Sequence, residues 1–483
     1  MRIDPCQSLH SLARQLASEI DQGRLDHALR VIHDFVERIV TEPLCTSQVY
    51  GSRKLDELCQ RVGRLNLATL STGPASAADR PADSPLVIYI VTRLQKSGGH
   101  SRVIEDFIAA RPLARHLILS TDLGGKSDID YLLNGVGRNA NVLLEGAGEG
   151  NFQQRLSWLQ GRLLQTAADK VYLFNHHQDS VAVAAIQPAM KLDASYYHHG
   201  DHQLCLGVYL SHLQHIDLHP MGYHTCREVL GVDNTYIPLT ADDKGDRPAD
   251  RPFLCGGQLT TCTAARSNKI EVPYFVSYLE LIPELLKATG GRHYHLGRLT
   301  PWALFKIRRG LKRAGVPAER FIYTAWVPSV WQALHELDVD LYVASFPYGG
   351  GLTLIEAMGA GVPVALHRHI FSPVLSGIGL AYPGVFNWRF PEELLGYCAT
   401  LTASDLERAG RAGRRQYESF HRPERLRAIL DGTAGEQAVP GDSAAAFTIE
   451  ADEFALWMER QLSLRRVLSR AAYRAFRRLR AWW

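Results

Sequence analysis

The sequence predicts an α/β protein made of two doubly wound, parallel-sheet, Rossmann-like lobes that follow an N-terminal all-helical extension. Apolar runs of strand length alternate with helix-length segments from residue 86 onward, as in parallel sheets with crossover helices. A polar linker at 241–252 divides this alternation into two blocks. The 483 residues are also too many for one ordinary core, so two lobes with appendages are expected.

The extension, residues 1–70, is predicted to contain helices only. Apolar side chains follow helical spacing in two stretches that end at Ile20 and Ile39, with Gly23 at the turn between them. The junction 23–29 is similar to the hairpin of a tetratricopeptide repeat, but no second repeat follows at a fixed period. An isolated helical cap is therefore expected, followed by a linker at 71–85 rich in Ser, Ala, Pro and Asp.

The first lobe is predicted to span residues 86–240. Its first strand, 86–91, is apolar throughout and leads into Gly98 and Gly99, after which a helix is expected from Val103. Further strands are expected at 116–120, 141–144, 170–174 and 194–198, with helices at 151–168 and 179–190.

The second lobe is predicted to span residues 253–432. It is expected to start with a strand at 253–257. Strands at 293–296, 321–324, 341–344 and 364–366 follow, then helices at 391–399 and 403–420. After a loose stretch at 433–446, a helical basic tail is expected at 447–483.

The motif richest in functional information follows the strand at 341–344. Three consecutive glycines let the backbone approach a ligand closely, and a helix is expected to open at about Thr353. The N–H groups at a helix start suit a diphosphate, the Thr353 hydroxyl adds a donor, and Glu356 can accept from ribose hydroxyls. The pattern predicts a nucleotide-sugar site, the alternative being an ordinary glycine turn. The donor-binding residues expected here are Gly350, Gly351, Leu352, Thr353 and Glu356.

This segment resembles the donor-binding signature of GT-B glycosyltransferases. The resemblance implies a GT-B fold, with the donor bound mainly by the second lobe and the acceptor mainly by the first. It also implies a cation near 266–269 that neutralises the donor diphosphate, Lys269 being the first choice and Arg266 the second. The alternative for either residue is a solvated charge at a helix start.

Two further contacts with the donor are expected, from the Gly98-Gly99 loop and from Trp326. The Gly98-Gly99 loop is expected to face the donor or the acceptor from the first lobe. Trp326 is expected to line the pocket for the nucleobase, and the alternative for this tryptophan is a place in the core.

Histidines cluster after the strand at 194–198, where open α/β sheets place their ligands. The region resembles O-GlcNAc transferases and bacterial cytoplasmic N-glycosyltransferases, which implies a general base among His199, Asp201 and His202. A metal site and buried structural hydrogen bonds are the alternatives. Because GT-B enzymes generally work without a metal, no metal and no cofactor are expected. The earlier pair His176 and His177 is interpreted as structural.

One departure bears on stereochemistry. Many retaining GT-B enzymes have two glutamates eight positions apart, but the residue eight before Glu356 is Tyr348. The resemblance therefore favours an inverting, metal-independent hexosyl- or N-acetylhexosaminyltransferase that uses a UDP-sugar. Its acceptor is a glycan, a lipid-linked glycan or a protein. The alternatives are a non-catalytic sugar-nucleotide or glycan-binding protein and a sugar-nucleotide epimerase of GT-B shape.

Composition narrows the partners and the location. A formal charge of +3 is too small to indicate nucleic acid, and no secretory pattern or apolar run of membrane-span length appears. The eight scattered cysteines indicate free thiols in a reducing cytoplasm. Residues 464–483 form an arginine-rich amphipathic pattern ending in tryptophans. It predicts peripheral contact with the inner face of the plasma membrane, or a helix docked on its own chain or on the twin subunit of a homodimer.

Overall fold

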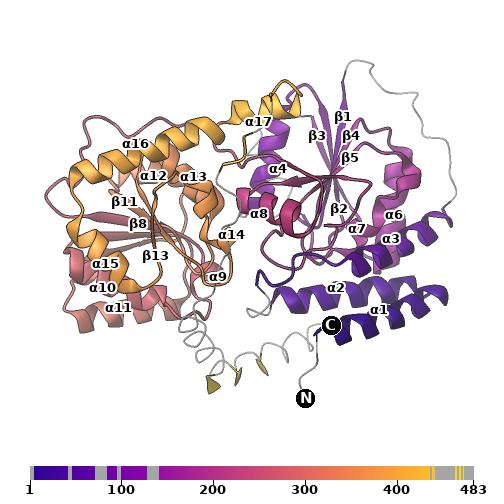
Figure 1. The fold of residues 1–483 in the computed structure, drawn as a ribbon, viewed down its shortest axis with the longest axis horizontal. Helices are drawn as coiled ribbons and strands as arrows, with labels where there is room; N and C mark the ends of the chain where they lie inside the picture. The colour runs from indigo at the N-terminus through magenta and orange to yellow at the C-terminus, as the bar shows by residue number, and fades with distance from the viewer. Residues whose placement is uncertain are drawn as a thin grey trace. The chain divides into compact units, whose positions relative to one another are not determined.

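The computed structural model describes residues 5–41, 46–70, 84–94, 99–127, 141–435 and 438–440, together with residues 463–464, 467–468 and 471–472. The chain divides into two compact units (Figure 1). Unit 1 comprises Met1–Thr240 and Pro423–Val439, and unit 2 comprises Ala241–Arg422 and Pro440–Trp483. Both contain a parallel sheet with helices on its two faces, which confirms the predicted fold class.

Unit 1 is built on a seven-stranded sheet in the order β3-β2-β1-β4-β5-β6-β7, with every pair parallel. Helix α4 lies on one face, and α6 and α7 lie on the other (Figure 1). The strands are β1 (Leu86–Val91), β2 (Arg115–Ser120), β3 (Val142–Gly146), β4 (Lys170–Phe174), β5 (Ala194–Tyr197), β6 (Gln214–Asp217) and β7 (Asn234–Tyr236). The helices are α1 (Pro5–Asp21), α2 (Leu25–Val40), α3 (Arg53–Leu67), α4 (Gly99–Ala110), α6 (Phe152–Gln165), α7 (Ser180–Ala185), η3 (Pro188–Met190), α8 (Pro220–His224), the π-helix η4 (Thr225–Val229) and α17 (Pro423–Leu430).

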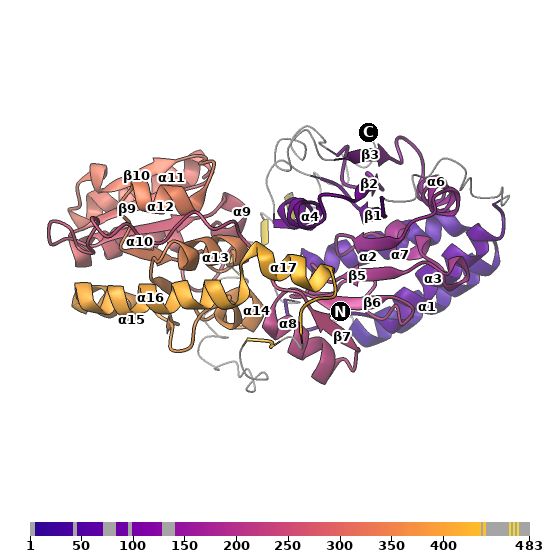
Figure 2. The same cartoon turned by 90° about the horizontal axis from the view of Figure 1, so that it is seen from above.

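The N-terminal helices share the core of unit 1 rather than forming a separate cap. Helices α2 and α3 pack against α6 and α7, and α1 packs on α2 and α3 (Figures 1 and 2). Helix α3 approaches α7 so closely that a Cβ on Gly63 would meet the carbonyl oxygen of Ala184. The Asp26 carboxylate of α2 also accepts from the backbone N–H of Phe152, at 2.7 Å, and so caps α6.

Unit 1 is completed by a segment from near the end of the described chain. Helix α17 packs against α4, and Arg111 Nη2 donates to the carbonyl oxygen of Leu430 at 2.9 Å (Figure 2). The preceding helix α16 belongs to unit 2. The segment that returns to the first lobe is therefore α17.

Unit 2 is built on a six-stranded parallel sheet in the order β10-β9-β8-β11-β12-β13. Helices α10, α11 and α15 cover one face, and α12, α13 and α16 cover the other (Figure 1). The strands are β8 (Thr260–Ala264), β9 (Arg292–Leu296), β10 (Phe321–Thr324), β11 (Leu341–Val343), β12 (Val364–His367) and β13 (Phe386–Trp388). The helices are α9 (Ser267–Ile270), α10 (Tyr278–Thr289), α11 (Pro301–Ala314), η5 (Ala318–Arg320), α12 (Val330–Glu336), α13 (Gly351–Gly359), α14 (Pro373–Ser376), η6 (Ile378–Leu380), α15 (Pro391–Thr400) and α16 (Ala403–Phe420).

The structure corrects several predicted elements. The first strand of unit 2 is Thr260–Ala264, and residues 253–257 form a turn with Gly256 and Gly257 at positive φ. Helix α4 begins at Gly99, whereas the sequence predicted its start at Val103. Strands β6, β7 and β13 were missed because they are three or four residues long and carry polar side chains such as His215 and Asn387.

Candidate functional site

Each sheet has a point where the strand order reverses, and ligands of open α/β sheets bind there, at the carboxyl ends of the strands. In unit 2 this point lies between β8 and β11, and the segments that leave these strands lead to α9 and α13. In unit 1 it lies between β1 and β4, which lead to α4 and α7. The residues predicted for donor binding and for the base follow strands at these edges.

The three glycines in unit 2 form the N-terminus of α13. Gly350 is the N-cap, and the helix begins at Gly351, two residues earlier than predicted. A Cβ on Gly349 would lie 2.5 Å from the carbonyl oxygen of Leu375, and one on Gly350 would lie 2.5 Å from Thr353 Oγ1. Contacts inside the protein therefore require glycine at positions 349 and 350. The absence of side chains here also leaves the first N–H groups of α13 accessible to an anion.

Lys269 lies against this glycine turn. Its Nζ donates to the carbonyl oxygen of Gly349 at 2.8 Å, and the backbone N–H of Tyr348 donates to the Lys269 carbonyl oxygen at 3.3 Å. A Cβ on Gly350 would lie 3.2 Å from the Lys269 ammonium. Burial of the ammonium lowers the pKa of Lys269 to about 8. The chain thus places an ammonium group beside the N-terminus of α13.

The other residues predicted for donor binding take different places. Arg266 is the exposed N-cap of α9, and Glu356 is half-buried in the second turn of α13. The Thr353 hydroxyl donates to the Gly350 carbonyl oxygen at 3.0 Å and accepts from Tyr342 Oη at 3.0 Å. In this structure the hydrogen bond from the Thr353 hydroxyl to the Gly350 carbonyl oxygen therefore stabilises the turn.

The remaining residues predicted for donor binding are Trp326, Gly98 and Gly99. Trp326 follows β10 and is 68% exposed, so the alternative of a core tryptophan is wrong. The buried tryptophan of this region is Trp331 instead. Gly99 is the first residue of α4, and Gly98 lies outside the described residues.

In unit 1 the structure brings the three predicted base candidates to the end of β5. Asp201 is buried, and its Oδ2 lies 2.6 Å from His219 Nδ1 while its Oδ1 lies 3.7 Å from His202 Nδ1. Burial alone would raise the pKa of Asp201. The neighbouring His219, through its charge and its hydrogen bond, holds this pKa below its ordinary value. Asp201 is thus an ionised carboxylate between two imidazoles that are partly exposed.

His199 has different surroundings from His202. Its ring stacks on His100 with centroids 4.6 Å apart, and His100 also contacts His176 at 5.1 Å. Burial, with the nearby His176, lowers the pKa of His199 to about 3. The rings of His100, His176 and His199 therefore lie together near the switch point of the sheet. They are next to Asp201, His202 and His219, which together are called the Asp201 group.

Two of these neighbours were not among the base candidates predicted from the sequence. His219 follows β6, a strand that was not predicted, so its place beside Asp201 could not be inferred. His176 follows β4 at the switch point, and its backbone N–H donates to Thr92 Oγ1 at 2.9 Å. Thr92 in turn donates to Asp179 Oδ2 at 2.7 Å. The interpretation of His176 as a structural residue stays a prediction.

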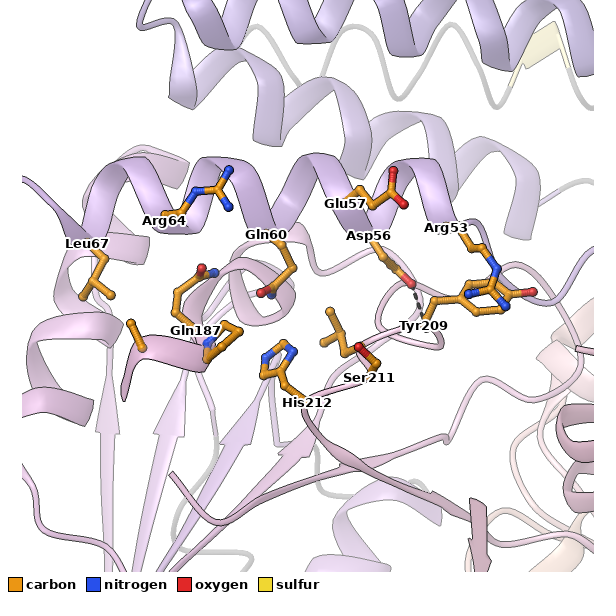
Figure 3. Close-up of a pocket in the computed structure, with 13 residues that line it drawn as sticks. Arg53, Asp56, Glu57, Gln60, Arg64, Leu67, Gln187, Tyr209, Ser211 and His212 are labelled. Atoms are coloured by element: carbon orange, nitrogen blue, oxygen red, sulfur yellow. Dashed lines mark hydrogen bonds between the residues drawn. The ribbon is translucent and has the colours of Figure 1, made fainter. Parts of the chain in front are cut away.

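A cavity of about 540 Å³ lies elsewhere in unit 1, between α3 and the segments that enter β5 and β6 (Figure 3). These segments mark the amino ends of the two strands, the opposite edge from the histidines. Its polar side chains bond to the protein: Gln60 Nε2 donates to Val183 O at 2.7 Å, and His212 Nε2 lies 3.1 Å from Ile186 O. None of the predicted site residues lines it.

Among the described residues, no helix is long and apolar enough to cross a bilayer. The tail prediction for 464–483 falls on residues of which only 464, 467–468, 471 and 472 are described, so it stays a prediction. Six cysteines of the described chain are free thiols: Cys59, Cys205, Cys226, Cys255, Cys262 and Cys398.

Two Rossmann-like parallel sheets, each wound outward from a central switch point, together define the GT-B fold. Solved glycosyltransferase structures share it with this chain. A mutant of the Thermobaculum terrenum O-GlcNAc transferase aligns over 93% of this chain and 82% of its own, with a TM-score of 0.50 and 17% identity. HepE of Anabaena, in complex with UDP and glucose, aligns over 72% and 98%, with a TM-score of 0.53 and 14% identity.

A glycosyltransferase of Rickettsia africae aligns over 72% of this chain and 98% of its own, with a TM-score of 0.55 and 13% identity. No protein-family model and no curated protein sequence matches the chain. At these identities the structures establish the fold, which confirms the GT-B resemblance.

Proposed function

We propose that this protein is a glycosyltransferase that transfers a sugar from a nucleoside-diphosphate sugar. The observation that carries the proposal is the Lys269 ammonium at the glycine turn, 2.8 Å from the Gly349 carbonyl oxygen. It stands beside the N-terminus of a nine-residue helix, α13, at the switch point of the sheet. A cation and a row of backbone N–H groups at one point are complementary to a diphosphate.

UDP is proposed as the leaving nucleotide. HepE, which shares the fold, has been solved with UDP and glucose and with UDP-glucose. The transferred sugar is proposed to be a hexose or an N-acetylhexosamine, because one neighbour is an O-GlcNAc transferase and another an outer-core galactosyltransferase.

In the proposed reaction the bond between the anomeric carbon and the diphosphate breaks, and UDP takes the bonding electron pair. The acceptor atom forms the new bond to the anomeric carbon and gives its proton to a base. Lys269 and the first N–H groups of α13 stabilise the negative charge that grows on the diphosphate, so no metal is required for this step. Glu356 accepts from the ribose hydroxyls.

The proposed base is an imidazole oriented by Asp201. His202 and His219 both contact its carboxylate, and both are partly exposed, whereas Asp201 itself is buried. A carboxylate that fixes an imidazole leaves the other ring nitrogen free to accept a proton. His202 is preferred because its side chain is the more exposed of the two, at 28% against 18%.

Inversion at the anomeric carbon is proposed. The residue eight positions before Glu356 is Tyr348, whose ring is parallel to His369 with centroids 6.4 Å apart. An aromatic ring there offers no carboxylate to the sugar. Comparing the anomeric configuration of donor and product by NMR tests this: an unchanged configuration would contradict it.

Contact with an anionic membrane is proposed, which favours a lipid-linked glycan over a free glycan or a protein as acceptor. Helix α11 is a second feature, besides the basic tail, that favours membrane contact. Its Trp302 and Phe305 rings stack with centroids 5.6 Å apart, and both side chains are about half exposed. Further along the helix, Arg308, Arg309, Lys312 and Arg313 are exposed. Exposed aromatic rings with basic residues on one helix are typical of interfacial binding.

Co-sedimentation with anionic and neutral vesicles tests this. Binding to anionic vesicles alone, lost on deleting 464–483 or on combining Trp302→Ser with Phe305→Ser, is the expected result. Trp326→Ser is the matched control, because that tryptophan is also exposed but lies outside α11. Equal binding by all these variants would contradict the assignment of membrane contact to the tail and α11. Loss of a homodimer on deleting the tail would instead assign the tail to subunit contact.

The function itself is tested in two steps. A thermal-shift panel of nucleotides and UDP-sugars is expected to show stabilisation by UDP, since a ligand at 100 times its Kd adds about 2.7 kcal/mol. Incubation with each stabilising UDP-sugar then separates the alternatives. A transferase slowly releases UDP, an epimerase changes the sugar but keeps the diphosphate, and a binding protein does neither. Absence of any nucleotide shift would contradict the donor site.

A further inference from the structure

Four buried side chains that can all ligate a metal converge in unit 1, behind the base candidates. His198 follows β5, His215 and Asp217 belong to β6, and Cys226 lies in the π-helix η4. Each is at most 3% exposed, and one ligand atom from each lies within 4.8 Å of the others. Single-turn π-helices are frequent at functional sites, and this one carries the thiol.

Three of these atoms lie at distances from one another that are close to those of a tetrahedral zinc site. His198 Nδ1 and Asp217 Oδ1 are 3.1 Å apart, and Cys226 Sγ is 3.4 Å from each of these two atoms. His215 Nε2 is 3.3 Å from Asp217 Oδ2. Zinc bonds of ~2.0–2.3 Å to nitrogen, oxygen and sulfur require ligand atoms roughly 3.3–3.7 Å apart in a tetrahedron.

As a hydrogen-bond network the group is incomplete. The buried nitrogens His198 Nε2, His215 Nδ1 and His215 Nε2 have no hydrogen-bond partner among the described residues. Such buried polar atoms are rare in native structures and call for a physical reason. A metal ion bonded to His215 supplies one, because it replaces the missing partner of one ring nitrogen.

A further residue supports the carboxylate of the group. Asn234 Nδ2, from β7, donates to Asp217 Oδ2 at 2.6 Å. Carboxylates that ligate metals are commonly held by such a second hydrogen bond, which fixes their orientation.

We propose that unit 1 binds one zinc ion through His198, His215, Asp217 and Cys226. Two imidazoles, a thiolate and a carboxylate suit zinc better than magnesium or calcium, which prefer oxygen ligands alone. All four positions come from protein side chains, so the ion has no open position and acts as a structural link. It is distinct from the metal site that was the alternative for His199, Asp201 and His202, because its ligands are other residues.

The ion joins the ends of β5 and β6 to η4. His198 continues directly into the 199–202 segment, and Asp217 is followed two residues later by His219. The metal therefore fixes both chain segments that form the Asp201 group, and this consequence alone depends on the proposed function. The zinc site itself does not.

Metal content decides the proposal. Full-length protein from zinc-supplemented cells, dialysed and measured by mass spectrometry, is expected to hold about one zinc ion per chain. His215→Ala and Cys226→Ser are expected to lose it. Cys262→Ser is the matched control, because that thiol is also buried but lies in β8 of unit 2. Variants that keep the wild-type zinc content while folded would overturn the site.

The absorption spectrum of cobalt-substituted protein is a second test, and it does not depend on the folding of any variant. Wild-type protein refilled with Co²⁺ is expected to show the intense visible bands of tetrahedral cobalt and a thiolate charge-transfer band in the near ultraviolet. The charge-transfer band reports Cys226 directly. Folded wild-type protein with less than about 0.1 zinc per chain and no cobalt bands would overturn the proposal, whatever its transferase activity.

Discussion

The Lys269 ammonium lies 2.8 Å from the carbonyl oxygen of Gly349, and residue 350 has no side chain to push it away. Two segments 80 residues apart thus bring a cation to the N-terminus of α13. The short helix α9 supplies the lysine after β8, and the glycine turn supplies the helix start after β11.

Lys269→Ala is expected to lower turnover by ~10²-fold or more while changing donor affinity less, because the cation acts most strongly on the charge that develops in the transition state. Steady-state kinetics with direct nucleotide binding measure both quantities. Arg266→Ala is the control, since Arg266 is the exposed N-cap of the same helix. If Arg266→Ala shows the larger loss of turnover, the two roles are exchanged.

The pH dependence of transfer is expected to report Lys269. Burial lowers its pKa to about 8, and only the protonated ammonium can neutralise the diphosphate. Activity measured as kcat/KM should therefore be highest below this pKa and fall as pH rises through about 8, because the free enzyme loses the charge. Lys269→Arg, whose guanidinium stays charged, should lose this limb of the profile. An identical limb in both proteins would assign it to another group.

Gly350→Ala is expected to weaken nucleotide binding by ~1–3 kcal/mol, the usual cost of overpacking. The added Cβ would lie 2.5 Å from Thr353 Oγ1 and 3.2 Å from Lys269 Nζ, so one of them must move. Gly396→Ala is the control, because Gly396 lies in α15 with open space around it. Calorimetric titration with UDP measures the affinities. Equal affinity in both variants would show that the nucleotide does not contact this turn.

Glu356→Ala is expected to weaken nucleotide binding by ~1.5–3 kcal/mol, the scale of a hydrogen bond to a charged group. Because the proposed contact is with ribose, the loss should also appear with uridine alone. Glu356→Gln keeps the size of the side chain and should lose less. An affinity for UDP that survives in a folded Glu356→Ala protein would remove this residue from ribose binding.

Asp201→Asn and His202→Ala are expected to lower transfer by ~10²–10⁴-fold without changing donor affinity, because the base meets only the acceptor. Asp233→Asn in the same unit is the control, since that carboxylate is almost fully exposed. His199→Ala should have a smaller effect, as this ring is stacked on His100. Near-normal transfer by the His199, Asp201 and His202 variants would place the base elsewhere, with His219 and His100 the next candidates.

The sequence predicts the donor half of the candidate site because its parts lie close together in the chain. A buried strand, a glycine turn and a helix with one acid lie within 25 residues, and backbone chemistry alone gives them a meaning. The sequence predicts the base half less completely. His199, Asp201 and His202 are neighbours in sequence, but His219 and His176 reach them only through the order of the strands.

By itself, the sequence determined the alternation of strands and helices, the division into two α/β blocks and the glycine turn, because each depends on apolar periodicity or on backbone freedom within a short window. Tertiary structure decided which loops meet. Parallel pairing of β8 with β11 brought Lys269 to Gly349. Parallel pairing of β5 with β6 brought Asp217 to His198, and the loops that follow these two strands brought His219 to Asp201. Such contacts depend on register between distant segments, and no local pattern of residues encodes that register.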